Sequence, residues 1–538
     1  MAEQFDFVII GAGAAGEAAS FMARARGASV AVVDRALFGG SCAFWACLPS
    51  KTLLHAAAVH VAGGDYDWPH ASARRDYMIV REGIDFPSDA SHLSALEKAG
   101  AVAIRGSARI AGPGTVIVSD GKAERTLRAG TIVVAVGSVS SVPALDGIDD
   151  IVPWTNREAT STRDLPESLV ILGAGPTGVE LGQVFARFGV PTALVASQPR
   201  ILPRDHPRNS EAVEAGLRRD GVDIRTGVRA LRIRARAGAS GAHVVDLSDG
   251  KSVAGREILL AVGRTLPLAG LGLETVGVQV ADGRAVVGPD LRIADGVFVA
   301  GDVAGPEMHT HIAHYQGERA VRIALGDTAR PDYSAIPHAV YTDPEAAGVG
   351  LTLEQATKAG HDAFEEVADL GTTAKGYVAE ASGHVTIVVD RKTRALVGAF
   401  IAGPAASEAI HEAVLAVKTK TPIDVLADTI HAFPPPRGSW AGYSRRRSKR
   451  WTPGGRCPGA PKAADGTVGG GRYSVSSAAA LSGRVGLRCI FAEGFGADQL
   501  VVVRERGRLG AGQLGAEDRS VEPPTCRAEQ RVPVAPRG

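Results

Sequence analysis

Two cysteines near the start of the chain have the spacing and the neighbours of a redox-active pair. Cys42 and Cys47 are separated by four residues within segment 39–51, where a glycine pair leads into a helix and Lys51 follows within a turn. A pair at this spacing can close a small disulfide ring and reopen it as a dithiol, which is redox chemistry. The alternative is two unrelated buried thiols.

A structural disulfide and a zinc site both explain these cysteines less well. A chain of 538 residues can bury its own core, so its stability does not need this bridge. A structural zinc site needs four ligands and usually a tighter first pair of cysteines. The remaining cysteines are hundreds of residues away, at Cys457, Cys489 and Cys526. We therefore predict no metal.

A nucleotide-binding motif precedes the cysteines. Residues 7–10 indicate a buried strand, and the run Gly11-Ala12-Gly13-Ala14-Ala15-Gly16 leads into an alanine-rich helix and a second strand that ends at Asp34. Glycines in this pattern allow a tight turn, a close approach to a pyrophosphate and the packing of helix on strand. The helix N-terminus favours an anion, and Asp34 can accept hydrogen bonds from a ribose. The pattern predicts a dinucleotide site.

The same pattern recurs in the middle of the chain. A strand at residues 168–172 leads into Gly173, Gly175 and Gly178, and Glu180 follows on the helix. Two such motifs in one chain predict two dinucleotides. For Glu180 alone, a favourable interaction with the helix dipole is the alternative role.

In combination these motifs resemble the flavoprotein disulfide reductases, the family of dihydrolipoamide dehydrogenase, glutathione reductase and mercuric reductase. The resemblance runs from about residue 4 to about residue 434. It implies an enzyme that passes hydride from NAD(P)H through FAD to the Cys42–Cys47 disulfide and on to a disulfide-type acceptor. It also implies that Cys47 is the thiolate against the flavin, that Cys42 attacks the substrate, and that Lys51 pairs with Glu180 beside the flavin.

The resemblance further implies a set of cofactor contacts. FAD would lie on the first motif, with NAD(P)H on the second. The expected contacts are Gly11, Gly13, Ala14, Ala15, Gly16, Asp34, Gly40, Ser41, Lys51, Ala108, Gly137, Ser138, Gly173, Gly175, Gly178, Glu180, Ser197, Arg200, Gly263, Asp302 and Ala313. Asp302 would hold the ribityl chain of FAD. His311 and His314 could be read as a metal pair, but we expect helix-surface or packing roles for them.

The choice between NADH and NADPH is read at the end of the strand at 192–195. Ala196 stands where NAD enzymes place an acid that holds the ribose hydroxyls, and Ser197, Gln198 and Arg200 follow it. Nothing in this stretch repels a 2′-phosphate, and Arg200 could bind one. We therefore expect a slight preference for NADPH over NADH.

The predicted fold class is α/β, with two Rossmann-like domains and an α+β interface domain. The second dinucleotide domain is inserted in the first, because the resemblance places Asp302 back in the FAD domain. A sheet with helices follows, and its resemblance to the family's interface domain implies a homodimer. The expected domains are 1–150 with 289–332 for FAD, 151–288 for NAD(P), 333–434 for the interface, and 435–538 as a basic tail rich in Gly, Arg and Pro.

The resemblance breaks at the acid/base that the partner subunit should supply. The family places a histidine directly before a proline, with an orienting glutamate beyond it. Here Phe433 and Gly438 occupy those two positions, and His431 lies two residues early. A phenyl ring cannot carry a proton. Two alternatives therefore stay open: a quinone or other diaphorase-type reductase without a disulfide substrate, and a chain that binds FAD with impaired turnover.

Charge separates the final segment from the rest. Residues 435–538 hold 18 Lys and Arg against 8 Asp and Glu, although the whole chain has a net charge of +1. We expect this tail to be disordered and without selected structure, as in out-of-frame translation, and a nucleic-acid-binding arm is the alternative. The sequence shows no signal peptide and no membrane-spanning run, so we expect a cytoplasmic protein without a membrane or nucleic-acid partner.

Overall fold

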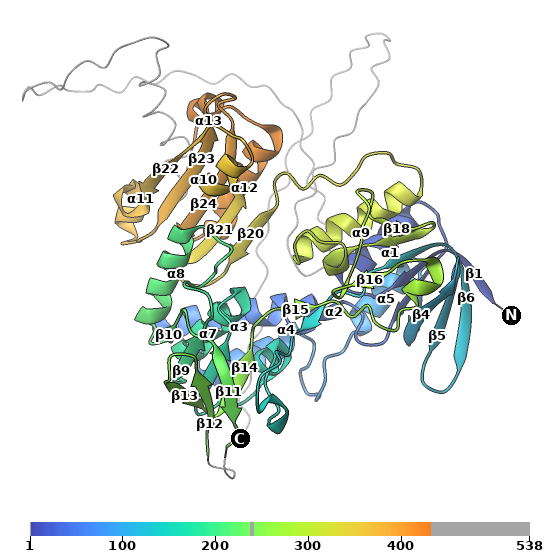
Figure 1. The fold of residues 1–538 in the computed structure, drawn as a ribbon, viewed down its shortest axis with the longest axis horizontal. Coiled ribbons are helices and arrows are strands. Elements are labelled where there is room, and N and C mark those ends of the chain that lie inside the picture. Colours follow the sequence, from blue (N-terminus) through green and yellow to red (C-terminus); the bar gives the residue numbers. More distant parts are fainter. Residues whose placement is uncertain (1, 237–240, 432–538) are drawn as a thin grey trace, which may run out of the picture. The chain divides into compact units, whose positions relative to one another are not determined.

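The fold was analysed in a computed structural model that describes residues 2–236 and 241–431, shown in Figure 1. Its strands form three larger sheets, each with helices against it, and three smaller ones. The expected α/β class is confirmed. Phe433, Gly438 and the basic tail lie outside the described residues.

The first sheet carries the first glycine motif. Its strands β1, β2, β3, β6 and β19 are parallel, and β18 pairs antiparallel with β19 at one edge. Continuous apolar runs such as FVII and TIVV suit strands that are buried on both faces. The bounds are β1 Glu3–Ile10, β2 Val30–Asp34, β3 Val102–Arg105, β4 Ser107–Gly112, β5 Thr115–Ser119, β6 Glu124–Val134, β18 Arg292–Ala294 and β19 Val297–Val299.

Two helices cover one face of this sheet. Helix α1 (Ala14–Ala25) packs against α9 (Thr310–Ala324), which begins far later in the chain. The helices approach so closely that a Cβ on Gly317 would lie 2.2 Å from the Ala15 carbonyl oxygen. Strand β19 also pairs with β6, so the first sheet is completed by residues beyond the second glycine motif, as the resemblance implied.

The second sheet repeats the first on a smaller scale. Its order is β10-β9-β8-β14, all parallel, and an antiparallel meander β11-β12-β13 lies between β10 and β14 in the sequence. The sequence patterns did not predict the meander. The bounds are β8 Leu169–Leu172, α7 Pro176–Arg187, β9 Thr192–Val195, α8 Pro207–Arg219, β10 Asp223–Arg225, β11 Ala230–Arg234, β12 His243–Leu247, β13 Ser252–Gly255 and β14 Glu257–Leu260.

The third sheet is antiparallel throughout, in the order β20-β21-β24-β23-β22. Helix α12 covers one face, and its apolar side chains share a core with β21, β23 and β24. The bounds are β20 Pro337–Val340, β21 Glu345–Gly350, α10 Leu353–Lys358, β22 Ala363–Asp369, α11 Ala374–Val378, β23 His384–Asp390, β24 Leu396–Gly403, α12 Ala406–Thr419 and α13 Ile423–Asp428.

Short elements connect the sheets. Two pairs of two-residue strands, β7 with β15 and β16 with β17, form small ladders. The bounds are α2 Gly40–Phe44, α3 Cys47–Val61, α4 Trp68–Met78, α5 Ala90–Lys98, β7 Val139–Ser140, α6 Asn156–Ser161, β15 Arg264–Thr265, β16 Val280–Ala281 and β17 Arg284–Ala285, with 3₁₀ turns at Ile148–Asp150, Leu273–Val276, Gly301–Val303 and Leu370–Thr372.

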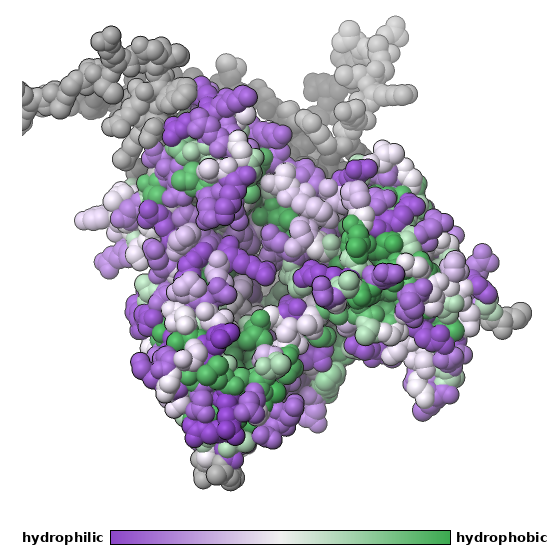
Figure 2. All heavy atoms as spheres, viewed as in Figure 1, coloured by the Kyte–Doolittle hydropathy of each residue, from purple (hydrophilic) through white to green (hydrophobic). Residues whose placement is uncertain are grey.

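The face drawn in Figure 2 shows hydrophilic side chains interspersed with smaller apolar areas. No helix within the described residues is both long and apolar enough to cross a bilayer.

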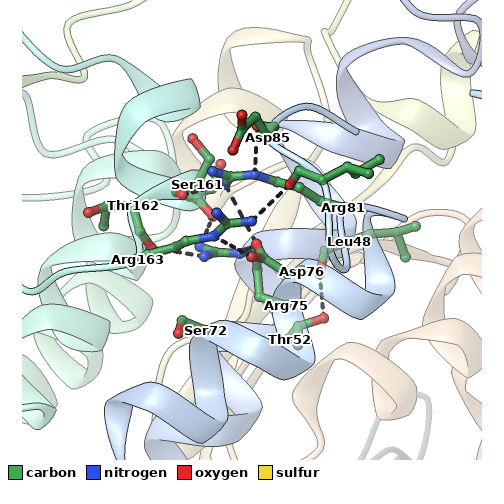
Figure 3. A network of polar contacts seen from close by, with 12 residues as sticks. Leu48, Thr52, Ser72, Arg75, Asp76, Arg81, Asp85, Ser161, Thr162 and Arg163 are labelled. Atoms are coloured by element: carbon green, nitrogen blue, oxygen red, sulfur yellow. Dashed lines mark hydrogen bonds and ion pairs between the residues drawn. The ribbon is translucent and has the colours of Figure 1, made fainter. Parts of the chain in front are cut away.

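A buried arginine fixes helix α6 to helix α4. Arg75 has no exposed surface, and its Nε donates to Asp76 Oδ1 at 2.8 Å. Its two terminal nitrogens donate to the carbonyl oxygens of Thr160 and Thr162, at the C-terminal end of α6. Figure 3 shows that Arg81 and Arg163 converge on the same carboxylate. The network satisfies carbonyls that a helix end leaves without partners.

We predict that Arg75→Met destabilises the fold by about 2–4 kcal/mol, because it removes one donor from a buried carboxylate and leaves two carbonyls without the donor they have here. Arg163→Met is the matched control: its side chain is 43% exposed, so its pair with the same Asp76 should contribute at most about 1 kcal/mol. Denaturant unfolding of both variants measures the difference. Equal losses would show that burial of Arg75 carries no special cost.

Candidate functional site

The two glycine motifs have the same geometry, each at the carboxyl end of a strand in a different parallel sheet. A Cβ on Gly11 or on Gly173 would lie 2.3 Å from a strand carbonyl oxygen, that of Ala135 or Ala261. Both glycines have positive φ, of 105° and 109°. The third glycines are equally constrained: a Cβ on Gly16 would lie 1.8 Å from the Gly11 oxygen, and one on Gly178 would lie 2.1 Å from the Gly173 oxygen.

The middle glycine of each motif is different, because it faces open space. A Cβ on Gly175 would meet no atom within 4 Å, and one on Gly13 would meet only the Cα of Gly40, at 3.8 Å. Gly40 has a φ of 68°, so two glycine turns of the first fold approach each other beside the N-terminus of α1. This arrangement leaves room for a pyrophosphate at the exposed amides of a helix N-terminus.

Asp34 lies at the end of β2, beside the first motif. Its Oδ2 accepts from the Ala12 amide at 2.7 Å, and its Oδ1 accepts from the Ala36 amide at 2.7 Å. The carboxylate thus braces the glycine turn, a role that sequence reasoning missed. A carboxylate has about four acceptor positions, so two of them can still serve a ribose.

The two cysteines lie on either side of a break between α2 and α3. Cys42 is on α2, Cys47 is the first residue of α3, and both are free thiols in this structure. The Cys47 sulfur lies 3.3 Å from the hydroxyl of Thr310, the first residue of α9. Cys47 therefore lies at the N-terminal ends of two helices, where their dipoles favour a negative charge.

The surroundings of the pair divide the two thiols into different roles. A hydrogen bond from Cys42 lowers the pKa of Cys47 to about 6; burial opposes this shift, whereas Thr310 and the charge of Lys51 add to it. The same hydrogen bond and burial raise the pKa of Cys42 well above its usual range. At neutral pH, Cys47 is the thiolate and Cys42 the thiol. This polarity agrees with the roles that the resemblance implied.

The expected pair between Lys51 and Glu180 is present. Lys51 Nζ lies 2.8 Å from Glu180 Oε2, and the Glu180 side chain is only 6% exposed. Burial disfavours the charged lysine, but the carboxylate outweighs this and raises the pKa of Lys51. Glu180 Oε1 accepts from the Tyr341 amide at 3.0 Å, and the ammonium lies 4.6 Å from the centre of the Tyr341 ring. Sequence reasoning missed Tyr341.

Ser138 and Asp302 come together although the chain separates them widely. The Ser138 hydroxyl donates to Asp302 Oδ2, and Arg264 Nε donates to the Ser138 hydroxyl. Arg264 Nη2 lies 3.6 Å from Asp302 Oδ2. Asp302 follows β19 and Ser138 follows β6, two paired parallel strands, so both lie at one sheet edge. Arg264 directly follows Gly263, which the resemblance marked as a cofactor contact, but no sequence pattern indicated that Arg264 would contact Ser138.

The other expected cofactor contacts are distributed over several elements. Ala15 and Ala313 approach the turn at Gly301, whose Cβ would lie 3.2 Å and 3.6 Å from theirs. Ala14 begins α1, Ser41 lies on α2, and Ala108 lies on β4. Gly137 and Gly263 follow β6 and β14 with φ values of 63° and 140°.

Arg200 is used differently from what we expected. Its Nη1 donates to the Leu202 oxygen and to the Ser210 hydroxyl, and its Nη2 donates to the oxygens of Pro203 and Asp205. The guanidinium therefore braces the loop that follows β9. Ser197 is exposed in this loop, directly beyond Ala196 at the end of the strand.

Both ring nitrogens of His431 contact oxygen atoms of its own chain. Its Nε2 lies 3.0 Å from Glu412 Oε1, and its Nδ1 lies 3.0 Å from the carbonyl oxygen of Thr429. Both ring nitrogens thus face oxygen acceptors, and neither is directed at a thiol. His311 stacks on His309, with ring centroids 5.1 Å apart. In the part of the chain that the structure describes, no three potential metal-ligating side chains cluster.

Comparisons with known proteins agree with this geometry. The family model for pyridine nucleotide-disulphide oxidoreductases matches residues 5–317, and the model for their dimerisation domain matches residues 336–441, slightly beyond the expected end at Pro434. The chain belongs to this family. It is an FAD-dependent oxidoreductase that uses NAD(P)H and a redox-active disulfide.

Individual relatives come from several branches of the family. A dihydrolipoyl dehydrogenase of Thermus scotoductus is 33% identical, with 80% of this chain and 94% of the relative covered. A mercuric reductase of Streptomyces lividans is also 33% identical, with 80% and 93% covered. Among solved structures, LpdA from Mycobacterium tuberculosis has a TM-score of 0.74 at 26% identity, with 83% of this chain and 99% of that chain covered.

The two open glycines give a matched test of the two sites. We predict that Gly13→Val lowers the FAD content of the purified protein at least tenfold, because its side chain fills the space for the pyrophosphate. Gly175→Val should keep FAD but lose reduction of the flavin by NAD(P)H. Both variants should fold, since neither Cβ clashes with the protein. Loss of FAD in Gly175→Val would contradict the assignment of the two sites.

The thiol chemistry predicts a pH profile. Cys47 of the reduced enzyme should be alkylated by iodoacetamide with a midpoint near pH 6, because its pKa is lowered to about 6 and the thiolate dominates above that pH. Thr310→Val should move the midpoint upward by about one unit, since it removes a hydrogen bond to the charged sulfur. Thr52→Val, whose hydroxyl contacts only the Leu48 carbonyl on α3, is the control. An unshifted midpoint in Thr310→Val would exclude its role.

Proposed function

We propose that Cys42 and Cys47 carry electrons from NAD(P)H to a small disulfide-type acceptor, with Cys47 next to the flavin and Cys42 exchanging with the substrate. The observation that carries this proposal is the opposite polarity of the two thiols, set by the hydrogen bond between them, by Thr310 and by Lys51. FAD, when bound, supplies the hydride acceptor between the nucleotide and the disulfide.

The chain's own residues hold and orient the reacting groups. Residues of the glycine turns at Gly11–Gly16 and Gly40 would hold the FAD pyrophosphate, and Asp34 and Asp302 would hold its ribose and ribityl hydroxyls. Lys51 keeps a positive charge near the thiolate, and Glu180 keeps that lysine charged and in place. When Cys42 attacks an acceptor disulfide, it must lose its proton, and its raised pKa makes a nearby base important.

A quinone-type or diaphorase-type acceptor is the second candidate. It is favoured by Phe433, which stands where the family has its histidine base, and by His431, whose nitrogens are both directed at other acceptors. An electron transfer to a quinone does not need that base. A chain that binds FAD but turns over poorly is the remaining alternative.

Three finer assignments belong to this proposal. The preference for NADPH over NADH rests on Ala196, because both terminal nitrogens of Arg200 already donate to oxygen atoms nearby in the chain. The dimerisation domain supports a homodimer, in which the partner copy would face Cys42. A cytoplasmic location fits a dithiol that must be reduced in each cycle, since reducing compartments keep thiols available.

We predict that the half-reactions separate. Stopped-flow reduction of the flavin by NADPH should be fast, and kcat/KM should favour NADPH over NADH. Turnover of lipoamide or glutathione disulfide should be about 10²- to 10⁴-fold below that expected with a histidine base, with quinone turnover spared. Phe433→His alone should help little, because Gly438 leaves no orienting carboxylate. Vigorous disulfide turnover by the unmodified chain would remove the case for a quinone acceptor.

A further inference from the structure

The meeting of Cys42 and Cys47 requires an interruption of the helix between them. On a continuous α-helix, residues five apart point about 140° away from each other and lie about 7.5 Å apart along the axis. Here α2 ends at Phe44 and α3 begins at Cys47, and Ala46 between them has a non-helical φ of −132° and ψ of −93°. The geometry of this break therefore decides how the two sulfurs meet.

The break leaves the carbonyl of Trp45 without a helical partner. In an α-helix that oxygen would accept from the amide four residues later, but residue 49 is a proline and has no N–H. Trp45 is a buried residue, and a buried carbonyl without a donor costs folding free energy. The donor must come from elsewhere in the chain.

Asn156, at the start of α6, provides that donor. Its Nδ2 lies 2.7 Å from the Trp45 oxygen, and Ser140 donates a hydroxyl to its Oδ1 at 2.9 Å, which fixes the orientation of the amide. Thr160 also lies 3.2 Å from the Trp45 oxygen. Its single hydroxyl hydrogen has a nearer acceptor, the Asn156 carbonyl at 2.7 Å, so Asn156 is the main donor.

Helix α6 is a firm support for this contact. Its next residue, Arg157, places its guanidinium 5.5 Å from the centre of the Trp45 ring. Its C-terminal carbonyls are held by Arg75 and Arg81, as Figure 3 shows. The short helix that carries Asn156 is thus held at both of its ends.

We propose that Asn156 is a positioning residue that sets the redox equilibrium of the Cys42–Cys47 pair by holding the Trp45 carbonyl at the helix break. The disulfide demands closer geometry than the dithiol, because its sulfurs must meet at about 2 Å with a restricted dihedral. Loosening the break therefore penalises the disulfide more than the dithiol. The proposal rests on the assignment of these cysteines as the redox pair, and it requires no particular acceptor.

The test measures that equilibrium directly. Full-length enzyme with bound FAD is equilibrated with reduced and oxidised dithiothreitol, the thiols are trapped by alkylation, and the peptide with Cys42 and Cys47 is quantified by mass spectrometry. The protein S–S bond breaks and the ring S–S bond of dithiothreitol forms; at neutral pH one thiol proton passes to Cys42, and the other is released to solvent because Cys47 stays a thiolate. For Asn156→Ala we expect the equilibrium constant for reduction to rise about tenfold, which is a potential about 30 mV more positive.

A second readout is the pH profile of Cys47 alkylation. The contact with Cys42 is the largest cause of the lowered pKa of Cys47, so Asn156→Ala should move the alkylation midpoint upward. Ser140→Ala, which removes only the hydroxyl that orients Asn156, should give a smaller shift in the same direction. If Asn156→Ala does not fold, Asn156→Ser takes its place, because serine is tolerated in the first turn of a helix.

Two control variants separate positioning from general stability. Ser161→Ala changes the last residue of the same helix, whose hydroxyl contacts only the Arg157 carbonyl, and should leave both readouts unchanged. Val349→Ala, which removes methyl groups from the core of the third sheet, should lower the Tm without moving the equilibrium constant. A folded Asn156 variant with an unchanged constant and midpoint would overturn the proposal. Failure of the unmodified enzyme to form the disulfide at any ratio would overturn the redox pair itself.

Discussion

The ion pair between Lys51 and Glu180 is the interaction on which the site depends. Lys51 comes from α3 and Glu180 from α7, two helices that share one core beside the second sheet. Glu180 is buried and also accepts from the Tyr341 amide beyond β20, so one carboxylate joins α3 and α7 to the third sheet. Loss of Lys51 would leave the buried Glu180 carboxylate without its cation, which typically costs about 3–5 kcal/mol. The lysine that satisfies this carboxylate also lowers the pKa of Cys47, so assembly and activation share one group.

The parts of this architecture that the sequence predicted are those fixed by local rules. Continuous apolar runs of four or five residues predicted β2, β8 and β9 to within one residue, because strands buried on both faces leave no alternation to misread; for β1 they predicted only the last four of its eight residues. The glycine positions were also predictable from local sterics. At Gly11 and Gly173 a Cβ would lie too close to the carbonyl oxygen of the residue directly beyond a neighbouring strand. The meander β11–β13 was missed because β11 carries two arginines among five residues and none of the three strands is a continuous buried apolar run.

Contacts between distant segments lay beyond the reach of sequence patterns. The pairing of Lys51 with Glu180 was predicted only through the family resemblance, because no local pattern connects residues so far apart. Thr310, Tyr341, Arg264 and Asn156 were not singled out, and each acts through a side chain or amide that meets its partner only after the sheets assemble. Arg200 shows the reverse case: its type and place suggested an anion ligand, whereas in this structure both of its terminal nitrogens donate to oxygen atoms nearby in the chain.

The redox pair shows why a five-residue step between cysteines needs help from outside its own helix. The step is too long for one helical face, and Pro49 then removes the amide that would continue the helix across the break. The interruption brings Cys47 to the first position of α3, where the amides of that helix and the start of α9 can stabilise a thiolate. It also exposes the Trp45 carbonyl, which Asn156 must satisfy. The helix break that activates the Cys47 sulfur thus also frees the Trp45 carbonyl, which joins the active-site segment to α6 through Asn156. The chemistry of the pair therefore depends on the packing around it.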